Sequence, residues 1–390
     1  MKLITNLISV ILIAVISFSY LSCSKDKKNP KTENSNLPYH QVIARQNADD
    51  PVWQSYTAKT IDRLPNFNFS QDPETDVYGG WKMASSNSSG FFKVEKKDNR
   101  WWIIDPNGNP FIHKGIAVFR PGFSANQKSA LKSKYGSEKN WAIKEISFLK
   151  KHGFNGTGAW SSIDLIRNTK EPLVYTLYID IIGLYHSQHV KKYGSRYAES
   201  EKVEHPDDLL MVFDSKFDAF LDREISKITK YKNDRYLLGY FTDNNLIWVD
   251  DALDQHLKYL DKNDAGYLAA KIWLDNRKGK EASLADIDDE DRTEFIGFYF
   301  ETYIKKLETA IRKYDPNHLY LGCRFDQELV NSKILEITGK YVDIVSINFN
   351  KKWQPDQADM SNWAKWSNKP FLISEWYTKG EDSGLPNRTG

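Results

Sequence analysis

Residues 236–248 read YLLGYFTDNNLIW, and residues 369–377 read KPFLISEWY. In each stretch a short apolar run ends in polar side chains, which are Asp243, Asn244 and Asn245 in the first and Glu375 in the second. Short runs that are apolar throughout are typical of strands buried on both faces, as in a parallel sheet. The two stretches therefore predict buried strands that carry polar groups to one edge of a sheet.

The same alternation of short apolar runs and longer amphipathic segments continues along the chain in both directions. Apolar residues recur at helical spacing over residues 141–152, 217–231 and 295–314. Strands are expected at residues 111–117, 154–158, 173–179, 236–241, 319–324, 343–348 and 370–374. Repeated strand–helix units require a parallel sheet, and about eight of them close into a barrel.

The predicted fold class is α/β, a (β/α)8 TIM-type barrel that lacks its eighth strand and is preceded by a β-hairpin over residues 91–105. An open, doubly wound sheet is the competing architecture, but no glycine-rich nucleotide loop follows any expected strand. Barrels of this type place their chemistry at the carboxyl ends of the strands. Polar residues at expected strand ends are therefore candidate site residues, among them Asn155, Arg324, Asn348 and Glu375.

The first residues of the chain are typical of a targeting signal. Lys2 precedes an apolar run that reaches Tyr20 and, at ~18 residues, could nearly span a bilayer. A small residue followed by Cys23 directly after such a run indicates a bacterial lipoprotein signal, in which residues 1–22 are removed and Cys23 is lipidated. A plain secretory signal and an uncleaved anchor helix are the alternatives. The expected product is a membrane-anchored bacterial lipoprotein in the outer membrane, on its periplasmic or cell-surface side.

The domain organisation follows from these segments. Residues 1–22 are the signal peptide, residues 23–74 a polar tether and irregular N-terminal segment, and residues 75–390 a barrel domain that is incomplete at its C-terminal end. The only other cysteine, Cys323, falls within an expected strand, where a lone cysteine is usually a small apolar filler.

Composition narrows the range of partners. A net charge of +2 does not favour nucleic acid as a partner, and no histidine or cysteine cluster has metal-ligand spacing, so neither a metal nor a cofactor is expected. Aromatic residues make up 14% of the chain, with 12 Trp, 21 Tyr and 20 Phe. Such richness fits either a large core or a groove in which aromatic rings stack on sugar rings.

Several motifs resemble glycoside hydrolases of the β-agarase type, which belong to a large clan of retaining (β/α)8 enzymes. They read WWIIDPNG at residues 101–108, HGFN at 152–155, GYFTDN at 239–244 and DPNH at 315–318. The resemblance covers roughly residues 75–390 and implies double-displacement hydrolysis of a β-linked, agar-like galactan.

The resemblance also implies roles for individual residues. Glu375 takes the position of the nucleophile, Asn244 that of the residue which contacts the substrate's 2-hydroxyl, and Asn245 that of the glutamate which serves as acid and base. An amide cannot act as a general acid, and general acid–base catalysis typically contributes about 10²–10⁴-fold. Phe349, where relatives carry a tyrosine, and the end of the chain after the loop that follows Glu375 are two further departures.

The expected partners are a polysaccharide or oligosaccharide and, through the lipid anchor, a membrane. A catalytically inactive carbohydrate-binding lipoprotein and a truncated gene product are the alternatives to a hydrolase. The expected substrate-binding residues are polar groups at strand ends and tryptophans near the two catalytic positions: Asn155, Trp160, Trp248, Arg324, Asn348, Trp353 and Trp376.

Overall fold

The computed structural model describes residues 40–44, 51–58, 73–82, 86–189, 209–246, 248–350 and 356–377, and the chain divides into two compact units. The first unit comprises residues 1–71 and 380–387. Its described residues include two strands, β1 (His40–Ala44) and β2 (Gln54–Ala58), which pair antiparallel. These strands lie within the segment that the sequence predicts to be irregular. Residues 1–22 and Cys23 lie outside the described residues.

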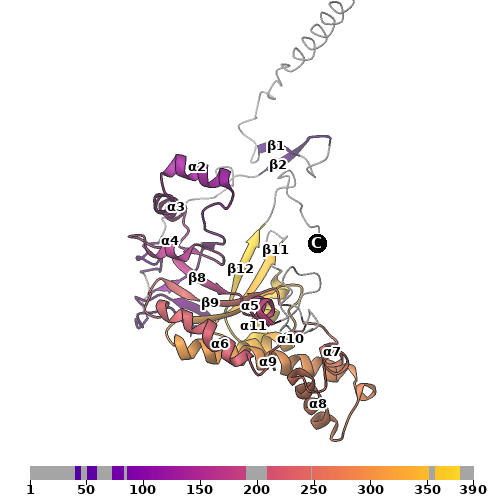
Figure 1. The fold of residues 1–390 in the computed structure, drawn as a ribbon. Coiled ribbons are helices and arrows are strands. Elements are labelled where there is room, and N and C mark those ends of the chain that lie inside the picture. The colour runs from indigo at the N-terminus through magenta and orange to yellow at the C-terminus, as the bar shows by residue number, and fades with distance from the viewer. Residues whose placement is uncertain are drawn as a thin grey trace, which may run out of the picture. The chain divides into compact units, whose positions relative to one another are not determined.

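The second unit is built on a parallel sheet of seven strands (Figure 1). In chain order the strands are β6 (Gly115–Ile116), β7 (Gly156–Thr157), β8 (Val174–Ile179), β9 (Leu237–Asn244), β10 (Leu319–Asp326), β11 (Val345–Asn350) and β12 (Phe371–Tyr377). Neighbours in the chain are neighbours in the sheet, and every pairing is parallel. The described strands thus form a half-barrel with β6 and β12 at its two edges, which confirms the predicted parallel, TIM-like arrangement.

Burial on both faces explains why these segments form strands. All eight residues of β9 except Asn244 are buried, and β10 and β11 are likewise buried except for their last residue. Gly239 is needed at its position because a Cβ there would stand 2.2 Å from the Leu319 carbonyl oxygen of the neighbouring strand. Continuous burial of this kind matches the apolar runs in the sequence.

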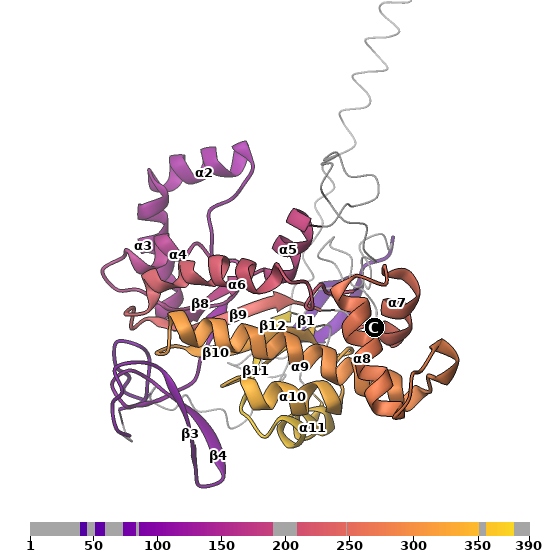
Figure 2. The same ribbon diagram turned by 60° about the horizontal axis from the view of Figure 1, so that its bottom comes forward.

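Helices cover the outer face of the sheet (Figure 2). Helices α6, α9, α10 and α11 pack side by side in that order. The capping box at Asp288, whose side chain accepts from the Asp291 backbone N–H, starts the longest helix, α9. The helix bounds are α2 Ala125–Tyr135, α3 Glu138–Lys151, α4 Ile163–Arg167, α5 Ile181–His189, α6 Phe217–Ser226, α7 Ala252–Tyr259, α8 Ala265–Lys278, α9 Asp289–Tyr314, α10 Ser332–Tyr341 and α11 Gln357–Ser367.

Short 3₁₀ helices and a small sheet complete the second unit. The 3₁₀ helices are η2 (Lys227–Tyr231) and η3 (Leu284–Asp286). Strands β3 (Lys93–Lys97), β4 (Arg100–Ile104) and β5 (Pro110–Phe111) form an antiparallel sheet. The single strand expected at residues 111–117 is therefore wrong: its start belongs to β5 and its middle to β6.

The buried residues form two clusters. The larger one lies between the sheet and its helices and includes Cys323, which is fully buried as expected for an apolar filler. The smaller one includes Leu238, Phe241 and Leu321 from the sheet together with Phe92 and Phe111 from the segment around β3 and β5. The sheet is therefore packed on both of its faces.

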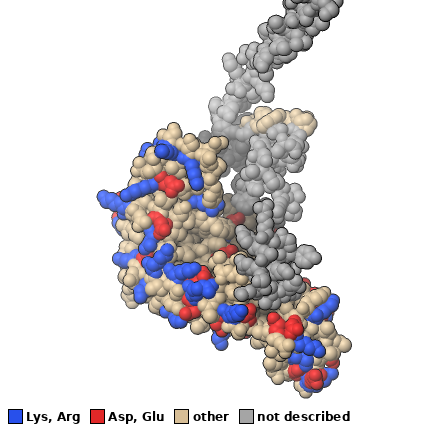
Figure 3. Space-filling model, in the orientation of Figure 1, with Lys and Arg blue, Asp and Glu red and all other residues tan. Residues whose placement is uncertain are grey.

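Two surface properties complete the description. On the face shown in Figure 3, the lysine and arginine side chains are interspersed with aspartate and glutamate. Among the residues that the structure describes, no helix combines the length and the hydropathy needed to cross a bilayer.

Candidate active site

Polar side chains from β9 to β12 meet at the carboxyl edge of the sheet, as expected for parallel strands. Arg324 of β10 stands at their centre and is fully buried. Its guanidinium donates from Nη1 to Oδ1 of Asn244 at 2.7 Å and from Nη2 to Oε2 of Glu375 at 2.9 Å. It also donates to the Ser374 backbone oxygen at 3.2 Å. One cation thus joins the ends of β9 and β12 through β10.

A second set of hydrogen bonds joins β11 to the same network. Nδ2 of Asn348 donates to Oδ1 of Asn244 at 3.0 Å and to Oδ1 of Asn245 at 2.9 Å. Oγ of Ser374 donates to Oδ1 of Asn348 at 2.8 Å. Because the amides of Asn244 and Asn348 are each held from two sides, neighbouring strands fix the orientation of these polar groups.

The charges at this edge are compensated in a low-dielectric setting. The Arg324 side chain has no exposed surface, whereas the Glu375 side chain is 27% exposed. Burial lowers the pKa of the Arg324 guanidinium, and the hydrogen bond and charge of Glu375 oppose that change. The Trp160 ring lies 4.3 Å from Cζ of Arg324 and adds a cation–π contact. A buried guanidinium paired in this way holds the Glu375 carboxylate in place while leaving part of it open.

Asp243 anchors the loop that follows β9. Its Oδ1 accepts the Ile182 backbone N–H of α5 at 2.8 Å, and its Oδ2 accepts the Tyr303 hydroxyl of α9. Burial is the main reason why the pKa of Asp243 rises to about 7, although the hydrogen bonds from Tyr303 and Ile182 oppose the rise. Asp243 and Asn245 both adopt positive φ angles, of 60° and 50°.

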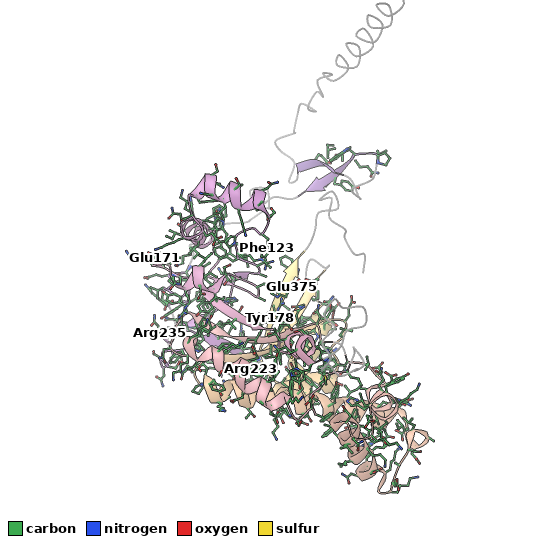
Figure 4. The ribbon with its side chains drawn as sticks, in the orientation of Figure 1. Phe123, Glu171, Tyr178, Arg223, Arg235 and Glu375 are labelled. Atoms are coloured by element: carbon green, nitrogen blue, oxygen red, sulfur yellow. The ribbon has the colours of Figure 1, made fainter. Side chains whose placement is uncertain are left out.

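A cavity of about 760 Å³ lies between the two edge strands of the sheet and reaches Glu375. It is lined by residues 113–118 around β6, by Phe154, Gly158, Trp160, Thr176 and Phe241 from β7 to β9, and by residues 372–376 of β12. In Figure 4, Glu375 and Tyr178 lie toward one edge of the sheet, whereas Glu171 and Arg235, which precede β8 and β9, lie at the other. The cavity therefore opens the interior of the half-barrel next to Glu375.

The structure brings most of the predicted site residues together. Glu375, Asn244, Asn245, Arg324 and Asn348 share the hydrogen-bond network at the carboxyl edge.

The two tryptophans nearest this network line the cavity. Trp160 lies beside Arg324, and Trp376, which is 50% exposed, follows Glu375.

Two other predicted contacts lie elsewhere. Asn155 precedes β7, so its placement at a strand end is wrong: its amide bonds the backbone of Ile112 and Lys114 at the amino edge. The Trp248 ring packs against Phe300 of α9 with centroids 4.7 Å apart and does not appear among the described residues that line the cavity. Trp353 lies outside the described residues.

The sequence patterns missed two features of the site. Tyr178 lies on β8 with its ring 5.4 Å from that of Trp160, and Ser374 bridges to Asn348. Their signal was their position within the last two residues of a predicted strand. Phe349 is fully buried in the larger cluster and its ring faces Trp363 of α11, which places it on the opposite side of β11 from Asn348.

Within the described part of the chain, no three histidine, cysteine, aspartate or glutamate side chains are grouped so that they could hold a metal ion. The described hydrogen-bond network itself consists of one carboxylate, one guanidinium, three amides and the Ser374 hydroxyl, and the His113 imidazole lines the adjoining cavity.

Comparison with known proteins relates this arrangement to agarases. No family model matches the sequence. The chain is 23% identical over 421 residues to β-agarase B of Vibrio sp. (strain JT0107), covering 81% of this chain and 42% of the relative. β-Agarase A of the same strain is 23% identical over 409 residues, covering 79% of this chain and 40% of the relative. The chain thus spans less than half the length of these two relatives.

Solved structures agree in fold. The crystal structure of BpGH50 has a TM-score of 0.65 and 26% sequence identity, covering 85% of this chain and 75% of that one. The agarase AgWH50C has a TM-score of 0.61 at 20% identity, covering 77% of this chain and 52% of that one, and shows the same fold. Together the comparisons confirm the predicted resemblance to β-agarase-type glycoside hydrolases.

Proposed function

We propose that this protein acts on a β-linked, agar-like galactan by a retaining mechanism in which Glu375 is the nucleophile. The observation that carries the proposal is the Arg324 guanidinium, which joins Glu375 to Asn244 at the mouth of a cavity. The agarase names of the sequence relatives support the substrate class.

Arg324 supports Glu375 both when it attacks the sugar and when it leaves again. A carboxylate that attacks an anomeric carbon must be ionised and fixed in direction, and a fully buried guanidinium 2.9 Å from Oε2 favours both. Arg324 also stabilises the carboxylate when it leaves again in the second displacement. The two terminal nitrogens of the guanidinium offset part of the cost of its burial, since they also donate to Asn244 and to the Ser374 backbone.

Asn244 is oriented to contact the sugar as a donor. Its Oδ1 accepts from both Arg324 and Asn348, so the amide N–H₂ is the part that remains to be offered to the substrate. A hydrogen bond to the 2-hydroxyl strengthens as the transition state forms, which makes this contact a contributor to rate.

Asn245 limits the reaction. The amide has no proton to give to a leaving oxygen and no lone pair basic enough to activate water. The expected hydrolytic activity on a polysaccharide is therefore lower by about 10²–10⁴-fold than with a carboxyl group at this place. For this reason a carbohydrate-binding protein without catalysis is the second candidate, and it is favoured by Trp160 and Trp376, two indoles that line the cavity.

The targeting segment completes the proposal. The apolar run before Cys23 supports a lipoprotein held at a bacterial membrane, where acyl chains on Cys23 would keep the protein near the membrane surface. A polysaccharide that cannot enter the cell would then meet the protein outside the cytoplasm.

Measurement of new reducing ends from agarose oligosaccharides tests the proposed function. Asn245→Glu and Asn245→Asp are expected to raise the rate at least about tenfold, because either restores a carboxyl group. Glu375→Gln is the matched control and should abolish the gain when combined with either. A folded Asn245→Glu variant that binds the oligosaccharide yet cleaves no faster than the parent would assign the protein to binding alone.

A further inference from the structure

We infer that the cavity beside Glu375 transfers glycosyl groups from activated glycosides to small anions more readily than to water. The inference rests on the proposed role of Glu375 and extends it to a second activity. It follows from two properties of the site. The proposed nucleophile Glu375 is paired with Arg324, whereas the position proposed for proton transfer carries the amide of Asn245.

Glu375 is the one carboxylate among the described residues that line this cavity. The three amides beside it, of Asn244, Asn245 and Asn348, are hydrogen-bonded to one another and to Arg324. None of these amides can serve as a general acid or general base near neutral pH.

Carboxylates on neighbouring strand ends are engaged elsewhere. Asp243 is 2% exposed and accepts the Tyr303 hydroxyl and the Ile182 backbone N–H. The side chains of Asp180 and Asp326 accept backbone N–H groups of the turns that follow them, from Gly183 and Glu328. None of the three lines the cavity.

The first displacement then depends on the leaving group. A Glu375 oxygen forms a bond to the anomeric carbon while the bond from that carbon to the leaving oxygen breaks, and the electron pair departs with the oxygen. A sugar alkoxide needs a proton at this moment, and among the described residues that line the cavity no carboxyl group other than Glu375 is present to supply it. The His113 imidazole also lines the cavity, but burial lowers its pKa to about 4, so it is neutral near pH 7. A nitrophenolate is stable without a proton, so a nitrophenyl β-galactoside can form the Glu375 glycosyl ester.

The second displacement depends on the acceptor in the same way. Water must lose a proton as it attacks, and Asn245 cannot take it. An azide ion attacks the anomeric carbon with no proton to lose, the ester bond breaks, and its electron pair returns to Glu375, where Arg324 stabilises the charge. Two inversions give a β-glycosyl azide.

The local charge does not oppose an anionic acceptor. Arg324 neutralises Glu375, which is the one carboxylate among the described residues that line the cavity. An anion that enters therefore meets no net negative charge from this pair.

The test follows nitrophenolate release from nitrophenyl β-galactoside by the full-length protein, with sodium azide or with sodium chloride at the same ionic strength. Azide is expected to raise the rate at least about tenfold, which recovers part of the acid–base contribution. Nuclear magnetic resonance should identify the β-galactosyl azide, and intact mass spectrometry without azide should show a galactosyl group on the protein. Glu375→Gln should show neither the rate increase nor the adduct.

Asn245→Glu separates the inference from the proposed function. If this variant hydrolyses the galactoside but azide does not accelerate the parent, the inference is overturned and the proposed function stands. If neither the variant nor the parent releases nitrophenolate or forms an adduct, the role of Glu375 itself is refuted. An α-configured azide product would also overturn the inference, because it requires a single displacement.

Discussion

Asp243→Asn should change how the stability of the fold depends on pH. Burial at the carboxyl end of β9 raises the pKa of Asp243 from its ordinary value of 3.8 to about 7. Between these two pH values Asp243 is protonated in the folded protein and ionised in the unfolded chain. Folding therefore takes up one proton in this range. The resulting stabilisation is complete below about pH 4 and is lost as the pH rises to about 7.

The size of the effect follows from the pKa difference. One pKa unit corresponds to about 1.4 kcal/mol, so the free energy of unfolding should fall by about 4 kcal/mol between pH 4 and pH 8 through this group alone. Asparagine has almost the same shape, accepts the Ile182 N–H through its oxygen and does not titrate. The difference in stability between Asp243→Asn and the parent should therefore grow by about 4 kcal/mol in favour of the variant across this range.

The assay is urea unfolding followed by tryptophan fluorescence at a series of pH values from 4 to 8. Asp291→Asn is a matched control, because Asp291 is also buried. Burial alone would raise the pKa of Asp291, but Lys278, the Asp288 backbone N–H and Arg277 together lower it to about 2. Its effect should be constant over this range. A pH-independent difference for Asp243→Asn, or one that favours the parent at pH 8, would refute the account of Asp243.

Three further predictions concern the network, the cavity and the anchor. Arg324→Lys should lower the free energy of unfolding by about 2–3 kcal/mol, because one ammonium cannot replace the hydrogen bonds that the guanidinium donates to both Asn244 and Glu375. An unchanged urea midpoint would contradict the proposed role of Arg324. Trp160→Ala should weaken the binding of agarose oligosaccharides about tenfold in calorimetric titration. Trp101→Ala, in β4 away from the cavity lining, should leave that binding unchanged, and equal losses in both would argue against stacking on Trp160. Cys23→Ser should move the protein from the membrane fraction to the soluble fraction, whereas unchanged partitioning would indicate an uncleaved helix.

The meeting of Glu375, Arg324 and Asn348 could be predicted because long buried strands leave a clear signal. Each lies at or near the end of an apolar run, and parallel strands carry their ends to the same edge. Asn155 could not be placed in this way, because β7 has only two residues and so carries no periodicity. Trp248 was beyond prediction for another reason: nearness in sequence to Asn245 does not determine whether an indole faces a cavity or, as here, α9.

The side chain at position 245 can change without loss of the rest of the candidate site. The Asn245 backbone N–H donates to the Arg324 oxygen at 2.8 Å, so β10 holds this loop in place independently of the side chain at 245. The φ angle of 50° lies in the left-handed region, which asparagine and aspartate tolerate and in which longer side chains cost about 1 kcal/mol. Glutamate at 245 would therefore bring a carboxyl group together with local strain, whereas aspartate would bring it without that strain but one methylene shorter. Strands β10 and β11 contact position 245 as well as the rest of the network, and β12 carries Glu375. Because the loop at 245 is held through its backbone N–H, a change of the side chain at 245 can remove proton transfer and leave the attack by Glu375 intact.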